Sequence, residues 1–352
     1  MRDLTDKYHH MDALRAVLVG CGGMSRAWLR AATATEGLSI VGLVDIVEDA
    51  ARARRDEFDL ANARTGDDLE AMLVATRPDI VFDVTVPEAH AQTTLTALRH
   101  GCHVLGEKPM ATSMDDARRM VEAAQRSGRL YAVVQNRRYT APIRRVREFL
   151  RCGAIGPLTT VNCDFYIGAH FGGFRDHMAH VLLLDMAIHT FDQARFLAGA
   201  DAVRVAFCKE WNPRGSWYER DASAIAIFEL SNGAVFTYRG SWCAEGLNTS
   251  WEGEWRFIGT NGSATWDGND GFRAQGPDES SGFIRKQREL PLPELDTAGL
   301  SEGHASLIRQ FARCVREGET PETICTDNIK SLAMVFGAIE AAEREQPADI
   351  RI

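Results

Sequence analysis

The sequence has few features of proteins that bind nucleic acids or span membranes. Its 352 residues carry 49 acidic and 40 basic side chains, so the formal net charge is −9. Nucleic acids and anionic membrane surfaces repel such an excess of negative charge. No apolar run approaches the roughly 18 residues of a membrane-spanning helix, and no hydrophobic signal segment opens the sequence. We therefore expect a cytoplasmic protein without nucleic-acid or membrane partners.

Cysteine is present, but not in the pairs that bind zinc or close small disulfide frameworks. The eight cysteines are scattered without a C-x-x-C motif, which favours reduced thiols. Internal repeats and low-complexity tracts are absent as well. With 45% hydrophobic and 25% charged residues, the chain is long enough to build two hydrophobic cores.

A glycine-rich turn near the N-terminus is typical of dinucleotide binding. The apolar run Arg15–Gly20 stops in the sequence Gly20-Cys21-Gly22-Gly23-Met24-Ser25, and a helical pattern follows. A strand, a glycine turn and a helix are the context that a dinucleotide fingerprint requires. Gly20 permits the tight turn, and Gly22 lets the backbone approach a pyrophosphate at the start of the helix. Ser25 takes the place of the third glycine and is small enough for close packing.

Asp45 stands where such proteins recognise the adenosine ribose. It ends the next apolar run, Ser39–Val44, about 20 residues after the glycine turn, where a carboxylate accepts hydrogen bonds from the ribose hydroxyls. Ile46 and Val47 follow, and neither can bind a 2′-phosphate. The sequence therefore predicts NAD rather than NADP. Asp45 can also cap a helix over Glu48–Phe58, and the two roles are compatible.

The periodicity of apolar residues predicts two domains. Strands alternate with helices over residues 14–134, which indicates a parallel, doubly wound α/β sheet. We place a Rossmann dinucleotide-binding domain at residues 13–134. Residues 135–346 are expected to form an α+β domain with a mostly antiparallel β-sheet. The C-terminal helices can pack back on the Rossmann domain.

Strand patterns and hairpin turns support the second domain. The turns are Asn232-Gly233 and Asn261-Gly262. The predicted strands are Val161–Ile167, Val203–Lys209, Ser223–Leu230, Ala234–Trp242, Trp251–Gly259 and Ser263–Trp266. Residues 268–300 are expected to be a long loop, followed by helices His304–Glu317 and Thr326–Gln346. Aromatic residues on these strands indicate packing or a subunit interface rather than a ligand site.

The segment Val181–Phe196 is a predicted helix that carries Asp185, His189 and Asp192. An α-helix advances 3.6 residues per turn, so Asp185 and His189, four residues apart, share one face. A carboxylate beside an imidazole can fix its tautomer and raise its basicity, which makes a proton-transfer pair. The alternative is a polar stripe of purely structural origin.

Four landmarks stand in order along the chain: the glycine turn at residues 20–25, Asp45, Glu107-Lys108-Pro109, and Asp185-Met186-Ala187-Ile188-His189. Together they resemble the glucose–fructose oxidoreductase, inositol dehydrogenase and rhizopine catabolism family, written Gfo/Idh/MocA. The resemblance covers nearly the whole chain. It implies a Rossmann domain, an open-faced sheet domain for substrate and oligomer contacts, and NAD(P) held between them.

The resemblance also implies site residues. The family's catalytic residues fall on Lys108, Asp185 and His189, and the Lys108–Pro109 bond is expected to be cis. The cofactor-binding residues expected are Gly20, Gly22, Gly23, Met24, Asp45, Thr85, Pro87, His90, Glu107 and Lys108. The substrate-binding residues expected are Arg175, His177, His180, Asp185 and His189. Many relatives have a glycine run where this chain has His177-Met178-Ala179-His180-Val181.

These residues predict an NAD-dependent dehydrogenase that acts on CH–OH groups. The substrate expected is a sugar, an inositol, or a related polyol or glycoside, and the chain is expected to form a homodimer or homotetramer through the β-sheet. Three alternatives stay open. One is a zinc site of His177, His180, Asp185 and His189; another is a non-catalytic sensor of NAD or sugar. The third is an enzyme that keeps NAD bound as a recycled redox shuttle.

Overall fold

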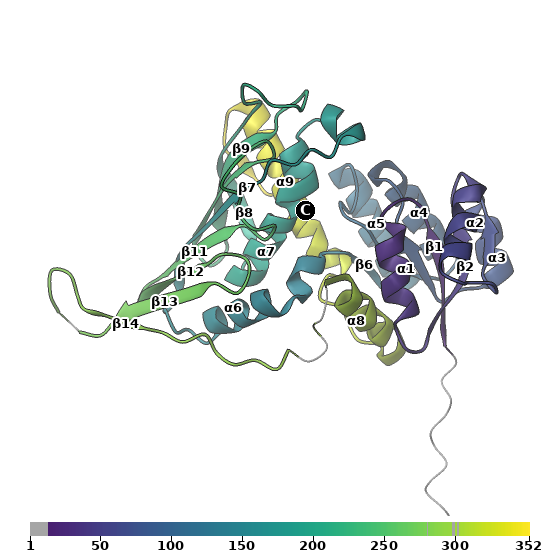
Figure 1. Ribbon diagram of the computed structural model, residues 1–352, viewed down its shortest axis with the longest axis horizontal. Helices are drawn as coiled ribbons and strands as arrows, with labels where there is room; N and C mark the ends of the chain where they lie inside the picture. Colours follow the sequence, from purple (N-terminus) through teal and green to yellow (C-terminus); the bar gives the residue numbers. More distant parts are fainter. Residues whose placement is uncertain (1–12, 280, 298–299, 301–302) are drawn as a thin grey trace, which may run out of the picture. The chain divides into compact units, whose positions relative to one another are not determined.

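The computed structural model describes residues 13–279, 281–297, 300 and 303–352. Contacts divide the described chain into two compact units (Figure 1). The first consists of the residues as far as Ala111, together with Arg119–Val134 and Leu307–Cys325. The second consists of Thr112–Arg118, Gln135–Ser306 and Thr326–Ile352. Within the described residues, no helix combines the length and the apolar character needed to cross a membrane.

The first unit contains a parallel sheet, as the alternating pattern predicted. Its described strands are β1 (Leu14–Val19), β2 (Leu38–Val44), β3 (Arg64–Gly66), β4 (Ile80–Asp83), β5 (His103–Gly106) and β6 (Tyr131–Val133). They lie in the order β3-β2-β1-β4-β5-β6, and every pairing is parallel. The strand order reverses beside β1, which is where doubly wound sheets bind dinucleotides. The apolar run of β1 is fully buried at Ala16, Val17 and Leu18.

Helices connect these strands. They are α1 (Ser25–Thr33), α2 (Glu48–Glu57), α3 (Leu69–Thr76), α4 (Pro87–Arg99) and α5 (Met114–Ser127). Asp68 caps α3 by accepting a hydrogen bond from the backbone of Ala71 at 3.1 Å, and Pro87 opens α4, where its missing N–H costs nothing. The helix α8 (Gly303–Glu317) comes from much later in the chain, and its residues from Leu307 onward belong to this unit.

The second unit is built on a sheet whose described strands are mostly antiparallel. They are β7 (Leu158–Tyr166), β8 (Ala202–Trp211), β9 (Ser223–Leu230), β10 (Val235–Ser241), β11 (Glu254–Gly259), β12 (Gly262–Trp266), β13 (Phe272–Pro277), β14 (Gln287–Glu289) and β15 (Ala348–Asp349). Their order is β14-β13-β12-β11-β7-β10-β9-β8-β15, and the pair β7–β10 is parallel. The predicted hairpin turns connect β9 to β10 and β11 to β12. The prediction of one long loop over residues 268–300 was wrong, since β13 and β14 lie within it.

One face of this sheet packs against helices and forms the core. The helices are α6 (Ala141–Arg151), α7 (Ile188–Ala198) and α9 (Cys325–Arg344), with short 3₁₀ turns at Asn136–Tyr139 and Gly173–His177. The ring of Phe191 on α7 lies 4.8 Å from that of Phe228 and 5.3 Å from that of Tyr238. The aromatic residues of the strands that face these helices are therefore packing residues. Trp251 is an exception, because it lies in a turn before β11 and is half exposed.

The predicted helix Val181–Phe196 is not a uniform α-helix. Residues Leu182–Ala187 form a π-helical turn, and α7 follows directly. Hydrogen bonds in a π-helix span five residues instead of four, and such turns are rare and often lie at functional sites. The argument that Asp185 and His189 share one α-helical face therefore does not hold across this turn. Sequence periodicity gave no indication of the inserted residue.

Candidate active site

The carboxyl edge of the parallel sheet gathers the residues predicted to bind a dinucleotide. Gly20 follows β1, Asp45 follows β2, Thr85 follows β4 and Glu107 follows β5. Ligands of open α/β sheets bind beyond this edge. Each of these four residues comes just after the end of a parallel strand, so all four lie at the same end of the sheet.

The glycine turn has the geometry of a phosphate-binding loop. Gly20 has a φ of +92°, and a Cβ there would lie 2.4 Å from the carbonyl oxygen of Val84, so only glycine fits. A Cβ at Gly22 or Gly23 would meet no described atom within 4 Å. The turn is closed towards the sheet and open on its other side, which fits a bound pyrophosphate. Ser25 is fully buried, as its role in close packing requires.

Asp45 is held rigidly by backbone groups. Its two carboxylate oxygens accept hydrogen bonds from Cys21 N–H at 2.7 Å and from Val47 N–H at 2.9 Å. It does not cap α2, whose first residue is preceded by Val47 without a side-chain cap. Burial, with the nearby Asp45 carboxylate, raises the pKa of the Cys21 thiol to about 12, so this thiol is neutral.

Arg54 of α2 lies beside the glycine turn, and the sequence analysis did not identify it. From α2 it donates a hydrogen bond through Nε to the Ser25 hydroxyl at 2.9 Å, and it pairs with Glu57 at 2.5 Å. Nothing in the local sequence singles it out among the arginines of α2. Only the packing of α2 beside the glycine turn brings its positive charge there.

The other predicted cofactor residues are anchored along the same edge. Thr85 donates to Asp83 at 2.6 Å, and the buried ring of His90 contacts the Thr85 carbonyl at 3.1 Å. Glu107 accepts hydrogen bonds from the indole of Trp28 at 2.7 Å and from the backbone of Lys108 at 3.1 Å. The bond between Lys108 and Pro109 is cis, as predicted. Met24 is half exposed beside the turn, and Pro87 begins α4.

In the second unit, buried ion pairs fix the helix α7. Arg138 donates from two nitrogens to the carboxylate of Asp192, both at 2.5 Å. Arg195 donates to Asp201 at 2.7 Å and to Asp327 at 2.6 Å. Arg138, Asp192 and Arg195 expose at most 6% of their side chains. The helix is therefore held from several distant segments, and its rotation about its own axis is defined.

Asp185, in the π-helical turn before α7, is bound by Arg175. The guanidinium of Arg175 donates to the two carboxylate oxygens of Asp185 at 2.7 and 3.3 Å. The Asp185 side chain is 11% exposed. His189, one of the predicted catalytic residues, follows on α7 and is 9% exposed.

The two histidines before the helix lie in different surroundings. His177 pairs with Glu219 at 2.8 Å, and both side chains are largely exposed. His180 pairs through Nδ1 with the buried Glu210 at 2.6 Å and lies 3.6 Å from Glu343 through Nε2. The hydrogen bond with Glu210 raises the pKa of His180, and burial raises the pKa of Glu210. Among the described residues no group of three His, Cys, Asp or Glu side chains is arranged to hold a metal ion.

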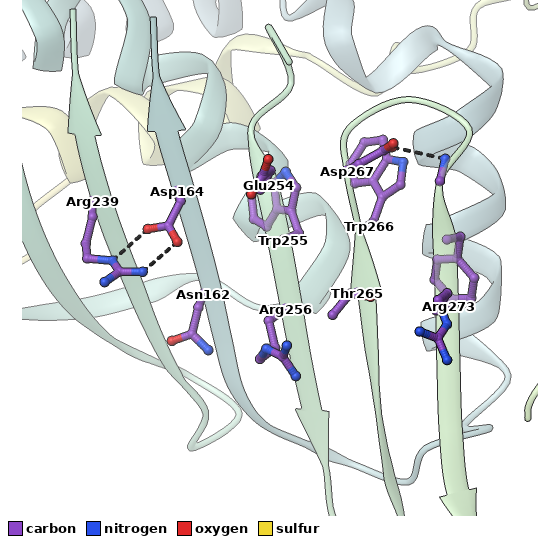
Figure 2. Close-up of a pocket in the computed structure, with 12 residues that line it drawn as sticks. Asn162, Asp164, Arg239, Glu254, Trp255, Arg256, Thr265, Trp266, Asp267 and Arg273 are labelled. Carbon is purple, nitrogen blue, oxygen red and sulfur yellow. Dashed lines mark hydrogen bonds and ion pairs between the residues drawn. The ribbon is translucent and has the colours of Figure 1, made fainter. Parts of the chain in front are cut away.

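The open face of the second sheet carries charged residues in rows. Asn162, Arg256, Thr265 and Arg273 are register neighbours across four strands, and together with Arg239 they line a cavity of about 540 Å³ (Figure 2). Figure 2 shows the guanidinium of Arg239 facing Asp164, at 2.6 Å for each of its two hydrogen bonds. Most residues that line the cavity are polar, and elsewhere on this face Phe207 and Val235 are exposed as well.

Comparison with known proteins assigns the fold to a family. Residues 14–135 match the model described as "Oxidoreductase family, NAD-binding Rossmann fold", and residues 143–265 match the Gfo/Idh/MocA C-terminal domain. The chain belongs to the Gfo/Idh/MocA family. Its first unit accordingly contains an NAD-binding Rossmann domain, and the matched model describes an oxidoreductase family.

Several family members are similar over much of their length. The chain is 26% identical to 1,5-anhydro-D-fructose reductase of Ensifer adhaerens over 341 residues, which cover 95% of this chain and 97% of the relative. It is 28% identical to D-glucoside 3-dehydrogenase of Escherichia coli (strain K12) over 243 residues, 63% of this chain and 68% of the relative. An oxidoreductase from Agrobacterium radiobacter, solved with NAD⁺, L-tartaric acid and magnesium, matches with a TM-score of 0.84 at 22% identity, covering 96% of this chain and 98% of that chain.

Proposed function

We propose that this protein oxidises a secondary hydroxyl group of a sugar, an inositol or a related glycoside, with NAD as the hydride acceptor. The observation that carries the proposal is the glycine turn at Gly20–Gly23, which is closed by the sheet and open to a pyrophosphate. Relatives named as reductases and dehydrogenases of anhydrofructose, glucosides and inositols support the class of substrate. The carboxyl-edge residues from Gly20 to Glu107 would hold the cofactor.

Lys108, Asp185 and His189 are proposed to act on one hydroxyl group. When bound, NAD supplies the hydride acceptor, so that loss of a hydride and a proton converts the alcohol into a ketone. In one route the hydroxyl proton passes to His189 while the Lys108 ammonium donates to the oxygen as negative charge develops on it; in the other, Lys108 begins as the neutral amine and takes the proton itself. Asp185 holds its place in the site through Arg175, at 2.7 Å.

Kinetics with variants of these residues test the proposal. The production of NADH is followed with a panel of inositols, aldoses, anhydrosugars and glycosides. Lys108→Ala and His189→Ala are each expected to lower kcat by about 10²–10⁴-fold, with the Kd for NAD nearly unchanged. The residue whose loss removes the acidic limb of the pH profile, where activity falls at low pH, is the base. Wild-type kcat in both variants, or no oxidation of any compound in the panel, would contradict the proposal.

The same assay addresses the exchange of NAD. An enzyme that uses NAD as a recycled redox shuttle would co-purify with NAD. It would oxidise one sugar only while reducing another, and it would not release NADH. A sensor would bind NAD without turnover. Release of NADH in proportion to the substrate consumed is the result expected here.

We also propose that NAD is preferred over NADP. Both oxygens of Asp45 are fixed by backbone N–H groups, so its negative charge cannot move away from a 2′-phosphate. Asp45→Ala is expected to reduce the ratio of kcat/KM for NAD to kcat/KM for NADP. A higher kcat/KM with NADP in the wild-type enzyme would show the opposite preference, with Arg54 as the residue to examine next.

The open face of the second sheet is the proposed contact between copies of the chain. Its rows of charge, Arg256 beside Glu254 and Arg239 beside Asp164, can pair with the opposite charges of a second copy. Arg256→Glu is expected to lower the molar mass measured by light scattering from that of a homodimer or homotetramer. The matched control is Arg118→Glu, an exposed residue of α5. An unchanged mass for Arg256→Glu would locate the contact elsewhere or show a monomer.

A further inference from the structure

Three aromatic residues near Asp185 remain exposed in the described chain, and we refer to Phe171, Phe174 and Trp251 as the aromatic rim. Their exposed fractions are 47%, 62% and 50%. Phe171 and Trp251 lie 6.4 Å apart, and both contact the buried Trp242, at 5.1 and 5.8 Å between ring centroids. Single exposed aromatic residues are common, but Phe171 and Trp251 form a pair that rests on a buried ring, and Phe174 joins them through the Arg175 guanidinium, which indicates a binding surface.

Arg175 connects the rim to the proposed catalytic helix. Its guanidinium carbon lies 4.9 Å from the Phe171 ring centroid and 4.7 Å from that of Phe174, and the same guanidinium donates to Asp185 at 2.7 Å. Arg137 connects Trp251 to the same helical turn. It donates hydrogen bonds to the Trp251 carbonyl and, at 3.3 Å, to the Met186 sulfur. Arg175 and Arg137 thus link the rim to Asp185 and Met186 of the π-helical turn.

The chemistry of the rim selects an apolar ligand. A site for a hydroxyl-rich sugar ring needs several well-placed hydrogen-bonding groups. Beside the three rings, the Trp251 carbonyl is already bound by Arg137. The Trp251 ring, and the faces of Phe171 and Phe174 that Arg175 does not cover, favour an apolar or aromatic group by stacking. None of the three lines the cavity on the open face of the second sheet.

We propose that the aromatic rim binds the apolar aglycone of a glycoside, whose sugar ring lies at Asp185. The substrate class is therefore an aryl or alkyl glycoside rather than a free inositol or an unsubstituted sugar. This inference rests on the proposed oxidation of a carbohydrate hydroxyl at Asp185 and His189. It adds a specificity-determining role for Phe171, Phe174 and Trp251.

Binding and kinetics test the two proposals separately. The Kd values for phenyl and methyl β-D-glucopyranoside are measured by tryptophan fluorescence, which needs no turnover. Tighter binding of the phenyl glycoside, by about tenfold, is expected from a stacked ring. The ratio of kcat/KM for the phenyl compound to that for the methyl compound is measured with the same pair. Binding without oxidation of any carbohydrate would reject the proposed function and leave the apolar binding surface intact.

Two variants and one control locate the effect. Phe174→Ala and Trp251→Ala are each expected to reduce the phenyl-to-methyl ratio by about fivefold to tenfold. Phe283→Ala, an equally large change at a fully exposed phenylalanine, should keep the wild-type ratio. Equal Kd values for the two glycosides in the wild-type protein would overturn the inference. So would a changed molar mass in Phe174→Ala with an unchanged ratio, which would make the rim a subunit contact.

Discussion

The two units build their candidate sites from different kinds of interaction. At the edge of the Rossmann sheet, backbone groups and residues that directly follow strands make the site, as in the bond from Cys21 N–H to Asp45. In the second unit, buried side-chain ion pairs join segments that are far apart in sequence, such as Arg138 to Asp192 and Arg195 to Asp327. Substitutions should therefore act differently in the two. In the first unit they change backbone conformation, and in the second they leave a buried charge without its partner.

The largest effect is expected at Arg138. Arg138→Met removes a guanidinium that is 6% exposed and leaves the carboxylate of Asp192 buried without its main partner. We expect the free energy of unfolding to fall by about 3–5 kcal/mol, measured by urea denaturation. Arg151→Met is the matched control, because Arg151 pairs with Glu148 at the surface of the neighbouring helix. Equal losses in the two variants would mean that the buried pair is not specially important to stability.

The glycine turn should separate stability from cofactor binding. Gly20→Ala forces a side chain into a φ of +92° and against the Val84 carbonyl, so a loss of about 1–3 kcal/mol in the free energy of unfolding is expected. Gly22→Ala meets no described atom within 4 Å and should change stability by less than about 0.5 kcal/mol. It should nevertheless raise the Kd for NAD, because the backbone there approaches the pyrophosphate. An unchanged Kd for Gly22→Ala would place the pyrophosphate elsewhere.

The same contrast explains what could be predicted from the sequence. Gly20, Asp45 and the parallel sheet were predicted from motifs and patterns in which each residue acts near its own position. β13 was not predicted because its sequence, Phe-Arg-Ala-Gln-Gly-Pro, has few apolar residues. It also contains glycine and proline, which are depleted in strands. β3 has no apolar residue at all, and it forms because β2 offers it a parallel edge.

Long-range pairs in the second unit escaped sequence reasoning for another reason. No motif marks Arg138, and nothing in the nearby sequence points to Asp192, 54 positions away. The π-helical turn at Leu182–Ala187 lies in an apolar sequence that is equally compatible with an α-helix. The partners of Arg175 and His180 depend on the same tertiary packing. Sequence motifs therefore located Asp185 and His189 but not the groups that position them.

His180 provides a pH-dependent test of the second unit. Its partner Glu210 comes from β8, and Glu343 of α9 and Asp221 also face it. The hydrogen bond with Glu210 raises the pKa of His180. The folded chain then holds a proton that the unfolded chain releases above about pH 6.5, so this stabilisation is complete below that pH and is lost as the pH rises through the folded pKa.

The Glu210→Gln variant measures this contribution. It should be less stable than the wild type by about 1 kcal/mol at pH 6, with a smaller difference at higher pH. Burial also raises the pKa of Glu210, which adds to the decline in wild-type stability as the pH rises. Urea denaturation of both proteins over a pH series gives the two curves. A difference that grows with pH would reverse the sign and reject a protonated His180.

The smallest effect is expected at His177, which differs from His180 in exposure rather than in chemistry. It also pairs with a glutamate, Glu219, and that hydrogen bond raises the pKa of His177 in the same direction. Both partners are largely exposed, however, so water and salt screen the pair and neither group gives up its hydration. His177→Gln should therefore leave Tm unchanged within error between pH 5 and 9, at low and at moderate salt. If Tm fell at pH 6 and recovered at high pH, an exposed pair would behave like the buried one. Burial would then not be what separates the two histidines, and His177 would have to be held by contacts that form only in a larger assembly or with substrate bound.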